Sequence, residues 1–428
     1  MLRKMKDSGF EWIGDIPNNW EVRKVKHYYT MQTGFTPDTK NETYYDDVEG
    51  YDWVNISDIQ DGKIIIGTKK KISQAYVDVF NPSIIPLGSL LYSFKLSVGQ
   101  VAYAGKPIYS NEAIASFLPS DNINLHYLRY SSMFIIENAQ TNIYNAKILN
   151  QDLINNAYIV FPPLSEQKAI ADFLDKKCAE IDAVIEKTKA TIEEYKKLKQ
   201  SVITEAVTKG IRGDRPMKDS GIEWIGEIPR EWDVSAIKNH FDIYSGATPK
   251  SEHQEFWDGD ILWITPADYK TDDKYVFGGK RTITTEGYES CGTTLIPAES
   301  IIFSKRAPIG SVVISGKQLC TNQGCLACVD KGRNSVLYYY FSMSAFTEIF
   351  ELYGSGTTFK EISFDSFSSF RLPHPSYEEQ QEIANYLEQK CAEIDTLIEK
   401  KTALLAEMET YKKSLIFEYV TGKKEVAV

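Results

Sequence analysis

The 428-residue sequence lacks any continuous apolar run of the length that a membrane-spanning helix requires. Its N-terminal residues, MLRKMKDSGFEW, are basic, but no apolar signal-peptide core follows them. Cysteine is scarce as well, because the six that occur are too few and too scattered for a disulfide framework. These absences favour a protein of the reducing cytoplasm that makes no contact with a membrane.

Positive charge is in short supply too. The chain has 48 Lys and Arg against 59 Asp and Glu, which gives a formal net charge of −11. Such a balance argues against a protein that coats nucleic acid without regard to sequence. A local positively charged surface can coexist with this acidity if the carboxylates face away from it.

Motifs for catalysis are missing. A DNA methyltransferase needs an Asn/Asp-Pro-Pro-aromatic tetrapeptide, and the sequence has none. A nucleotide-driven translocase needs G-x-x-x-x-G-K-[ST]. The nearest match, at residues 310–318, has one residue too many between its glycines and Gln318 in the hydroxyl position. The sequence therefore predicts no catalytic residues, no metal site and no cofactor in this chain.

The sequence does contain an internal repeat that spans both of its halves. Five segments of the first half return in the same order after about 210 residues. They are residues 5–22 and 217–234, 33–37 and 245–249, 52–59 and 262–269, 90–101 and 301–312, and 165–187 and 378–400. A match of this order and spacing indicates a tandem duplication, which dictates the architecture.

Each repeat has a globular part and a helical part. The globular parts are rich in short apolar runs with Gly and Pro turns, which predicts compact α/β (α+β) domains. The helical parts begin after PPLSEQ and PHPSYEEQ, where the prolines end and Ser165 or Ser376 can cap a helix. The predicted boundaries are 1–161 and 213–372 for the globular domains and 162–212 and 373–428 for the helical regions.

Apolar residues in both helical regions recur in alternating steps of four and three, the pattern of a coiled-coil seam. The seam residues are Leu174, Ile181, Ile185, Ile192, Val202, Leu387, Ile394, Ile398, Leu405 and Leu415. The shared phase predicts two long antiparallel helices related by a pseudo-twofold axis; alternatively, each helix packs only on its own domain. Lys199 and Lys412 also fall on the seam, where a charge specifies register or a partner.

The sequence resembles the specificity subunits of type I restriction–modification systems. The resemblance lies in WIGDIPNNWEV and WIGEIPREWDV, SGATPKSEHQEFWDGDILWITPADY, IIFSKRAPIGSVVI, and the helix entries PPLSEQKAIADFL and YEEQQEIANYL. It covers both halves of the chain. The first half departs from the family in TGFTPDTKNETYYDD, where a Pro-rich, Trp-containing loop is usual.

The resemblance implies that each globular domain is a target-recognition domain that reads one half of a split site in double-stranded DNA. It implies that the helices hold these domains apart and dock two methyltransferase subunits, which in turn bring restriction/translocase subunits. S-adenosylmethionine and ATP with Mg²⁺ are then expected on the partner subunits, in a bacterial or archaeal cytoplasm. Because the globular halves differ in sequence, the two half-sites should differ as well.

Positive residues that recur in turns of both repeats are the candidate DNA contacts, since phosphate contacts position a reader without specifying sequence. They are Lys69, Lys70, Lys71, Lys95, Lys147, Lys280, Arg281, Lys305, Arg306 and Lys360. The competing interpretation is that they are solvated loop charges. Polar residues that differ between the repeats are the candidate base readers, namely Thr141, Asn142 and Asn145 against Ser355, Thr357 and Thr358.

Cys320, Cys325 and Cys328 have a spacing that also occurs in iron–sulfur sites. The equivalent positions of the first repeat are Tyr109, Ile114 and Phe117, so the pattern favours buried strand positions where cysteine serves as a small apolar residue.

Two other functions compete with a non-catalytic DNA reader. A stand-alone DNA enzyme would require the cofactor motifs that are missing. A structural adaptor that pairs through its helices and ignores DNA would suit the net acidity.

Overall fold

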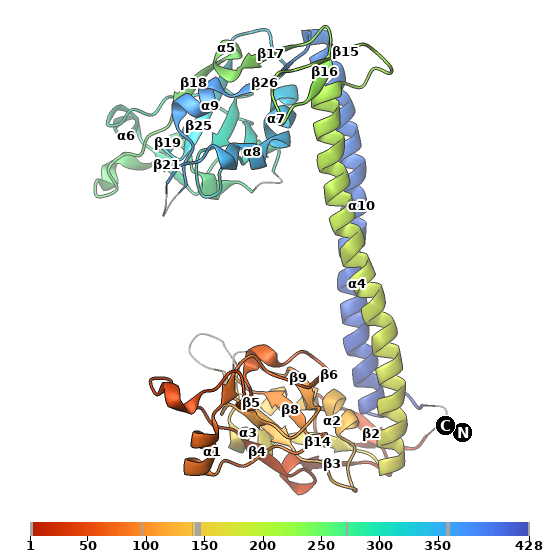
Figure 1. The fold of residues 1–428 in the computed structure, drawn as a ribbon. Coiled ribbons are helices and arrows are strands. Elements are labelled where there is room, and N and C mark those ends of the chain that lie inside the picture. Colours follow the sequence, from red (N-terminus) through yellow and green to blue (C-terminus); the bar gives the residue numbers. More distant parts are fainter. Residues whose placement is uncertain are drawn as a thin grey trace. The chain divides into compact units, whose positions relative to one another are not determined.

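The computed structural model describes residues 3–95, 97–138, 140–141, 147–270, 273–356 and 360–426. The chain divides into two compact units, residues 1–187 with 404–428 (unit 1) and residues 188–403 (unit 2). Each unit holds one globular domain and a stretch of both long helices, α4 (Leu164–Lys209) and α10 (Tyr377–Val420) (Figure 1). The boundaries predicted for the globular and helical regions remain a prediction.

The domain of unit 1 is built on a five-stranded mixed sheet. Its order is β4 (Met31–Thr33), β11 (Ile114–Phe117), β8 (Leu90–Ser93), β9 (Val101–Ala104) and β6 (Lys63–Ile65). Every residue of β8, β9 and β11 is buried, which is why these strands are mostly apolar and show no regular alternation of apolar and polar residues. At the edge, β6 pairs with β9 in parallel and leaves Ile64 exposed.

Smaller sheets complete unit 1. A three-stranded sheet has the order β10 (Tyr109–Ser110), β5 (Tyr51–Val54) and β7 (Lys71–Ile72). Three antiparallel pairs are β1 (Met5–Asp7) with β2 (Asp15–Pro17), β3 (Glu21–Lys24) with β14 (Tyr158–Phe161), and β12 (Gln140–Thr141) with β13 (Lys147–Ile148). The short helices are α1 (Gln74–Phe80), α2 (Leu125–Ser131) and α3 (Gln151–Asn155).

Unit 2 repeats this topology. Its five-stranded sheet has the order β18 (Phe241–Ser245), β25 (Cys325–Asp330), β22 (Ile301–Ser304), β23 (Val312–Ser315) and β20 (Tyr275–Val276). Its three-stranded sheet has the order β21 (Arg281–Ile283), β19 (Trp257–Ile264) and β24 (Cys320–Thr321). The strand pairs are β15 (Met217–Asp219) with β16 (Glu227–Pro229) and β17 (Asp233–Ala236) with β26 (Arg371–His374).

The helices of this domain are α5 (Ile237–His240), α6 (Thr285–Glu289), α7 (Val336–Ala345), α8 (Thr347–Leu352) and α9 (Phe364–Ser369). Polar caps recur between the domains, since Asn124 caps α2 and Ser335 caps α7 by accepting a backbone N–H three residues on. The prediction of two mixed α/β domains in tandem, each with a long helix, is confirmed.

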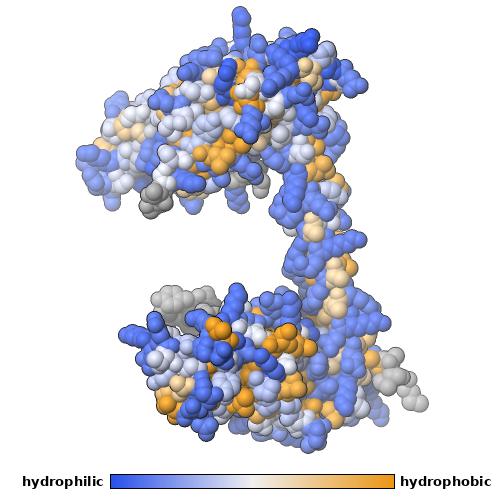
Figure 2. Space-filling view, viewed as in Figure 1, coloured by the Kyte–Doolittle hydropathy of each residue, from blue (hydrophilic) through white to orange (hydrophobic). Residues whose placement is uncertain are grey.

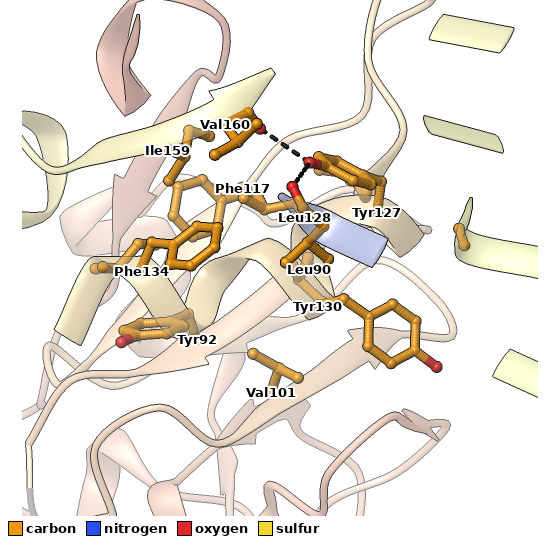
Figure 3. Close-up of a cluster of buried hydrophobic side chains, with 14 of the residues drawn as sticks. Leu90, Tyr92, Val101, Phe117, Tyr127, Leu128, Tyr130, Phe134, Ile159 and Val160 are labelled. Atoms are coloured by element: carbon orange, nitrogen blue, oxygen red, sulfur yellow. Dashed lines mark hydrogen bonds between the residues drawn. The ribbon is translucent and has the colours of Figure 1, made fainter. Parts of the chain in front are cut away.

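One buried tyrosine ties each domain to the helices. In unit 1, Tyr127 lies in the apolar cluster of Figure 3, and its hydroxyl donates to the carbonyl oxygens of Val160 at 3.0 Å and Val420 at 3.2 Å. Its counterpart in unit 2, Tyr338, donates to Pro373 and Val207. A buried hydroxyl without a partner is costly, so these bonds fix the end of one helix on the domain core.

The two helices run antiparallel in each unit. In unit 1 the start of α4 packs with the end of α10, and in unit 2 the end of α4 packs with the start of α10. Leu174, Ile181, Ile185, Leu387, Ile394 and Leu415 are buried, and Ile192, Val202, Ile398 and Leu405 are partly buried. Leu174 and Leu387 also belong to the cores of the domains, so the helices contact both each other and the globular parts.

The seam lysines form ion pairs across the helix pair. Lys412 Nζ lies 2.7 Å from Asp182 in unit 1, and Lys199 Nζ lies 2.7 Å from Asp395 in unit 2. The duplication makes the second pair the repeat of the first. A charge at a seam position is satisfied only when its partner is opposite, so these pairs favour one antiparallel register.

The helix entries differ in their caps. Ser376 accepts the backbone N–H of Glu379 and caps α10, as predicted. Ser165 does not cap α4, because the helix begins at Leu164 and the Pro163 carbonyl accepts the N–H of Gln167 instead.

The face drawn in Figure 2 is mainly hydrophilic, with apolar side chains in smaller groups. Among the described residues, no helix is both long and apolar enough to cross a membrane.

Candidate nucleic-acid interface

The first basic cluster lies between β6 and β7 in unit 1. Lys69 and Lys70 are exposed, whereas Lys71 is the partly buried first residue of β7. The Nζ of Lys71 donates to the Val48 carbonyl oxygen at 2.8 Å, and its backbone N–H donates to Asp47. The ammonium group of Lys71 is therefore engaged within the domain, and Lys69 and Lys70 are the two lysines that face solvent.

The corresponding segment of unit 2 presents Lys280 and Arg281. Lys280 is exposed, and its backbone N–H donates to Asp268 at 2.9 Å. The guanidinium carbon of Arg281 lies 3.4 Å from the ring centroid of Trp257. This cation–π contact orients the arginine without neutralising it, so its charge stays available to an anion.

Lys95 follows β8 in unit 1 and is exposed. Its Nζ lies 3.8 Å from Glu112, a long ion pair between two half-exposed groups. A hydrogen bond from Thr36 holds the pKa of Glu112 below its usual value, so that this carboxylate stays charged beside the lysine. Exposed pairs of this kind contribute little to stability.

The equivalent residues of unit 2 are held more firmly. Lys305, of which only 13% of the side chain is exposed, lies 2.7 Å from Glu361, and Arg306 contacts the other oxygen of that carboxylate at 3.3 Å. Hydrogen bonds from Lys305 and then from Arg306 lower the pKa of Glu361. Lys360 is exposed next to it in the chain. The fold thus brings Lys305 and Arg306 together on one carboxylate, next to which Lys360 lies in the chain.

Some candidates cannot be placed. Lys147 lies in β13, but its side chain is outside the described part of the structure, as is that of Thr141. Asn142, Asn145, Thr357 and Thr358 also lie outside the described residues. Ser355 forms an isolated bridge with Glu361. The assignment of base readers therefore remains a prediction.

The three cysteines occupy buried strand positions. Cys320 lies in β24 and Cys325 and Cys328 lie in β25, at positions equivalent to Tyr109, Ile114 and Phe117 in unit 1. Burial raises the pKa of the Cys320 thiol to about 11 and that of Cys325 to about 12, so both are neutral thiols. The structure confirms that these are buried strand residues. Within the described residues, no group of three or more His, Cys, Asp or Glu side chains is arranged to hold a metal ion.

One recurring basic position was missed by the sequence reasoning. Lys106 follows β9 and Lys317 follows β23, and both are exposed. The signal was present in AGKPIYS (104–110) and SGKQLCT (315–321), where the glycine–lysine pair recurs among otherwise different residues.

A family model described as "Type I restriction modification DNA specificity domain" matches residues 17–194 and again residues 229–407. A protein named putative type I restriction enzyme MjaX specificity subunit, from Methanocaldococcus jannaschii, is 29% identical over 100% of this chain and 99% of its own length. The MjaIX specificity subunit of the same organism is 37% identical over 180 residues, 41% of each chain.

Solved structures have a similar fold. A chain from a structure that addresses complex assembly and conformational transition of a type I R-M system has a TM-score of 0.75 with 16% identity. It covers 96% of this chain and 99% of its own. The HsdS subunit from Thermoanaerobacter tengcongensis has a TM-score of 0.53 with 17% identity and covers 96% and 98% of the two chains.

Proposed function

Because this chain belongs to the family of type I restriction–modification DNA specificity subunits, we propose that each of its two recognition domains reads one half of a bipartite site in double-stranded DNA. The observation that supports this proposal is that the two domains share one fold but have loops of different sequence. Strand order and register recur in both domains, whereas the links between strands differ in sequence. Two readers on one framework, each with its own loops, suit two different half-sites.

The chain acts as a recognition subunit and performs no chemistry itself. Two methyltransferase subunits dock on the paired helices α4 and α10, and restriction/translocase subunits join through them. S-adenosylmethionine and ATP with Mg²⁺ belong to those partners, in the cytoplasm of the host cell. Support comes from the family and from helices whose outer faces carry many polar side chains along their length.

The isolated chain is therefore expected to transfer no methyl group. Incubation of the purified protein with S-adenosylmethionine and duplex DNA should leave the DNA unmodified, and addition of the methyltransferase partner should produce modification. Incorporation of labelled methyl groups measures both. Methyl transfer by the partner-free chain, purified to exclude the partner, would refute the non-catalytic role.

The bipartite reading is tested by making the two domains identical. In a chimera, residues 227–374 are replaced by residues 15–161, which begin and end at equivalent strands. We expect the DNA site modified in cells to change from two different half-sites to two copies of one. A map of modified bases from cells that express the chimera with its methyltransferase partner reads this directly.

The chimera should fold because its anchors to the helices are matched. Tyr127 replaces Tyr338 at the helix-end carbonyls, and Trp20 replaces Trp232. The reciprocal chimera, with two copies of the second domain, is the control and should yield two copies of the other half-site. An active chimera with an unchanged site would contradict the assignment of one half-site to each domain.

A further inference from the structure

We propose that Lys106 and Lys317 contact DNA phosphates as part of a basic edge that each recognition domain builds from the same three structural positions. The basic edge comprises Lys69, Lys70 and Lys106 in unit 1, and Lys280, Arg281 and Lys317 in unit 2. This inference rests on the proposed DNA-reading function and adds to it the part of each domain along which the DNA backbone runs.

Strand register makes the positions equivalent. Lys106 lies three residues before Tyr109, which pairs with Trp53, and Lys317 lies three residues before Cys320, which pairs with Trp263. In the neighbouring strand pair, Asp52 is opposite Lys71, and Leu262 is opposite Thr282. This register matches Lys69 with Lys280 and Lys70 with Arg281. Three positive residues therefore recur at positions whose surroundings have diverged.

In each domain a backbone hydrogen bond holds the turn that carries Lys106 or Lys317 against the strand that precedes the other two basic residues. In unit 1 the backbone N–H of Gly105 donates to Ile65 at 2.9 Å, which brings the turn carrying Lys106 against the end of β6. Lys69 and Lys106 line one open hollow of about 690 Å³. In unit 2 the backbone N–H of Gly316 donates to the Val276 carbonyl oxygen in the same way. The turn lies so close to the next residue, Phe277, that a Cβ on Gly316 would be only 2.3 Å from the Phe277 ring.

The charges of the basic edge are largely uncompensated. Lys69, Lys70, Lys280 and Lys317 are exposed, and none of them has an ion-pair partner among the residues that the structure describes. Two adjacent carboxylates accept backbone N–H groups, Asp58 that of Asn55 and Asp268 those of Thr265 and Lys280. Like charges gathered on one edge repel each other, and a polyanion relieves this repulsion.

The two domains differ at one point of this edge. Asp52, whose side chain is 91% buried, forms an ion pair with Lys106 and accepts the backbone N–H of Thr68 at 2.8 Å. Burial alone would raise the pKa of Asp52, but the hydrogen bonds from Lys106 and Thr68 lower it. Leu262 takes the position of Asp52 in unit 2. Lys317 therefore offers a full charge to a phosphate, whereas Lys106 is already neutralised in part.

The test is the salt dependence of binding to a fluorescent duplex of random sequence, measured on the chain in complex with its methyltransferase partner. Each lost phosphate contact reduces the slope of log affinity against log salt concentration by about one unit. We expect Lys317→Ala to reduce the slope by about one unit and Lys106→Ala by less than half of that. Asp52→Asn, which releases Lys106, should steepen the slope.

Two controls separate charge from folding. Lys317→Gln should reproduce the loss, and Lys317→Arg should restore the slope, because only the second retains a charge. Lys238→Ala, which removes an exposed lysine of α5 outside the basic edge, should leave the slope unchanged. If the unaltered complex binds the duplex with a steep salt dependence and Lys317→Ala matches Lys238→Ala, the basic edge is overturned and the DNA-reading function stands. If the unaltered complex binds no duplex, the proposed function itself fails.

Discussion

Replacement of Glu379 by alanine is expected to lower the free energy of unfolding of unit 2 by about 3 kcal/mol or more. The side chain of Glu379 is 3% exposed. One carboxylate oxygen accepts from Arg215 at 2.6 Å, and the other accepts from the indole N–H of Trp232 at 2.9 Å. Removal of the carboxylate leaves the buried indole N–H of Trp232 without an acceptor, and leaves the nearly buried guanidinium of Arg215 with Glu231, 3.0 Å away, as its remaining carboxylate partner. A buried N–H without an acceptor and a guanidinium that has lost its buried partner together cost more than the original interactions contributed.

The duplication supplies the control for this prediction. Glu166 holds Trp20, Arg3 and Asn19 in the same arrangement in unit 1, but 26% of its side chain is exposed. Water reaches the guanidinium of Arg3, whose side chain is 20% exposed, whereas Trp20 is as buried as Trp232, so the loss from Glu166→Ala should be smaller, about 1 kcal/mol. Hydrogen exchange of backbone amides, compared between the two units, measures each loss separately. Equal losses from both substitutions would show that burial of the carboxylate does not set its contribution.

Glu379→Gln refines the result, because an amide can still accept from Trp232 but cannot offset the charge of Arg215. We expect it to fall between the unaltered protein and the alanine variant. The guanidinium also lies 5.1 Å from the Trp232 ring centroid and donates to the Lys209 carbonyl, which limits the damage.

The sequence was sufficient for the architecture because the repeat and the heptad steps are properties of local spacing. Equal spacing of five segments predicts equal topology, and the two five-stranded sheets have the same strand order. The seam lysines were more informative than expected. Lys199 and Lys412 pair with Asp395 and Asp182, and both partners stand within matched segments of the repeats.

The engagement of the candidate DNA contacts could not be predicted, because it depends on residues distant in sequence. Glu361 reaches Lys305 across 56 positions, and the carbonyl of Val48 reaches Lys71 across 23. A basic residue in a turn looks the same in the sequence whether its charge is free or paired. The fold shows that Lys106 pairs with Asp52, and that Leu262 takes the position of Asp52 in unit 2.

Acidification should destabilise unit 2 more than unit 1, through a pair of stacked histidines. The rings of His240 and His374 lie 4.0 Å apart between centroids, and Tyr339 Oη lies 2.7 Å from His374 Nδ1. Burial, with a smaller contribution from His374, lowers the pKa of His240 to about 4, and burial lowers that of His374. The charged groups that act on the pair are Asp233, Asp330 and Lys331.

The direction of the stability change on acidification follows from proton linkage. An unfolded histidine has a pKa of about 6.5, above that of either folded residue, so the unfolded state binds more protons below that pH. The contribution of the pair is complete above about pH 6.5 and is lost as the pH falls toward 4. Because both rings are only partly buried, we expect a loss of about 1–2 kcal/mol at pH 5.

Unit 1 has residues that do not titrate in this pH range at the positions of the two histidines, so it shows which substitutions should remove the acid sensitivity of unit 2. The equivalent positions hold Tyr28 and Phe161, whose rings stack at 3.5 Å between centroids and do not titrate in this range. The double variant His240→Tyr, His374→Phe should therefore lose its acid-dependent destabilisation of unit 2. The double variant also loses the hydrogen bond between His374 and Tyr339, but the cost of that loss is the same at every pH. It therefore does not change how the free energy of unfolding depends on pH. Urea unfolding at several pH values between 7 and 4.5 measures how the free energy of unfolding depends on pH in the unaltered protein and in the double variant. Identical slopes would show that other groups, such as the carboxylates of unit 2, cause the acid sensitivity.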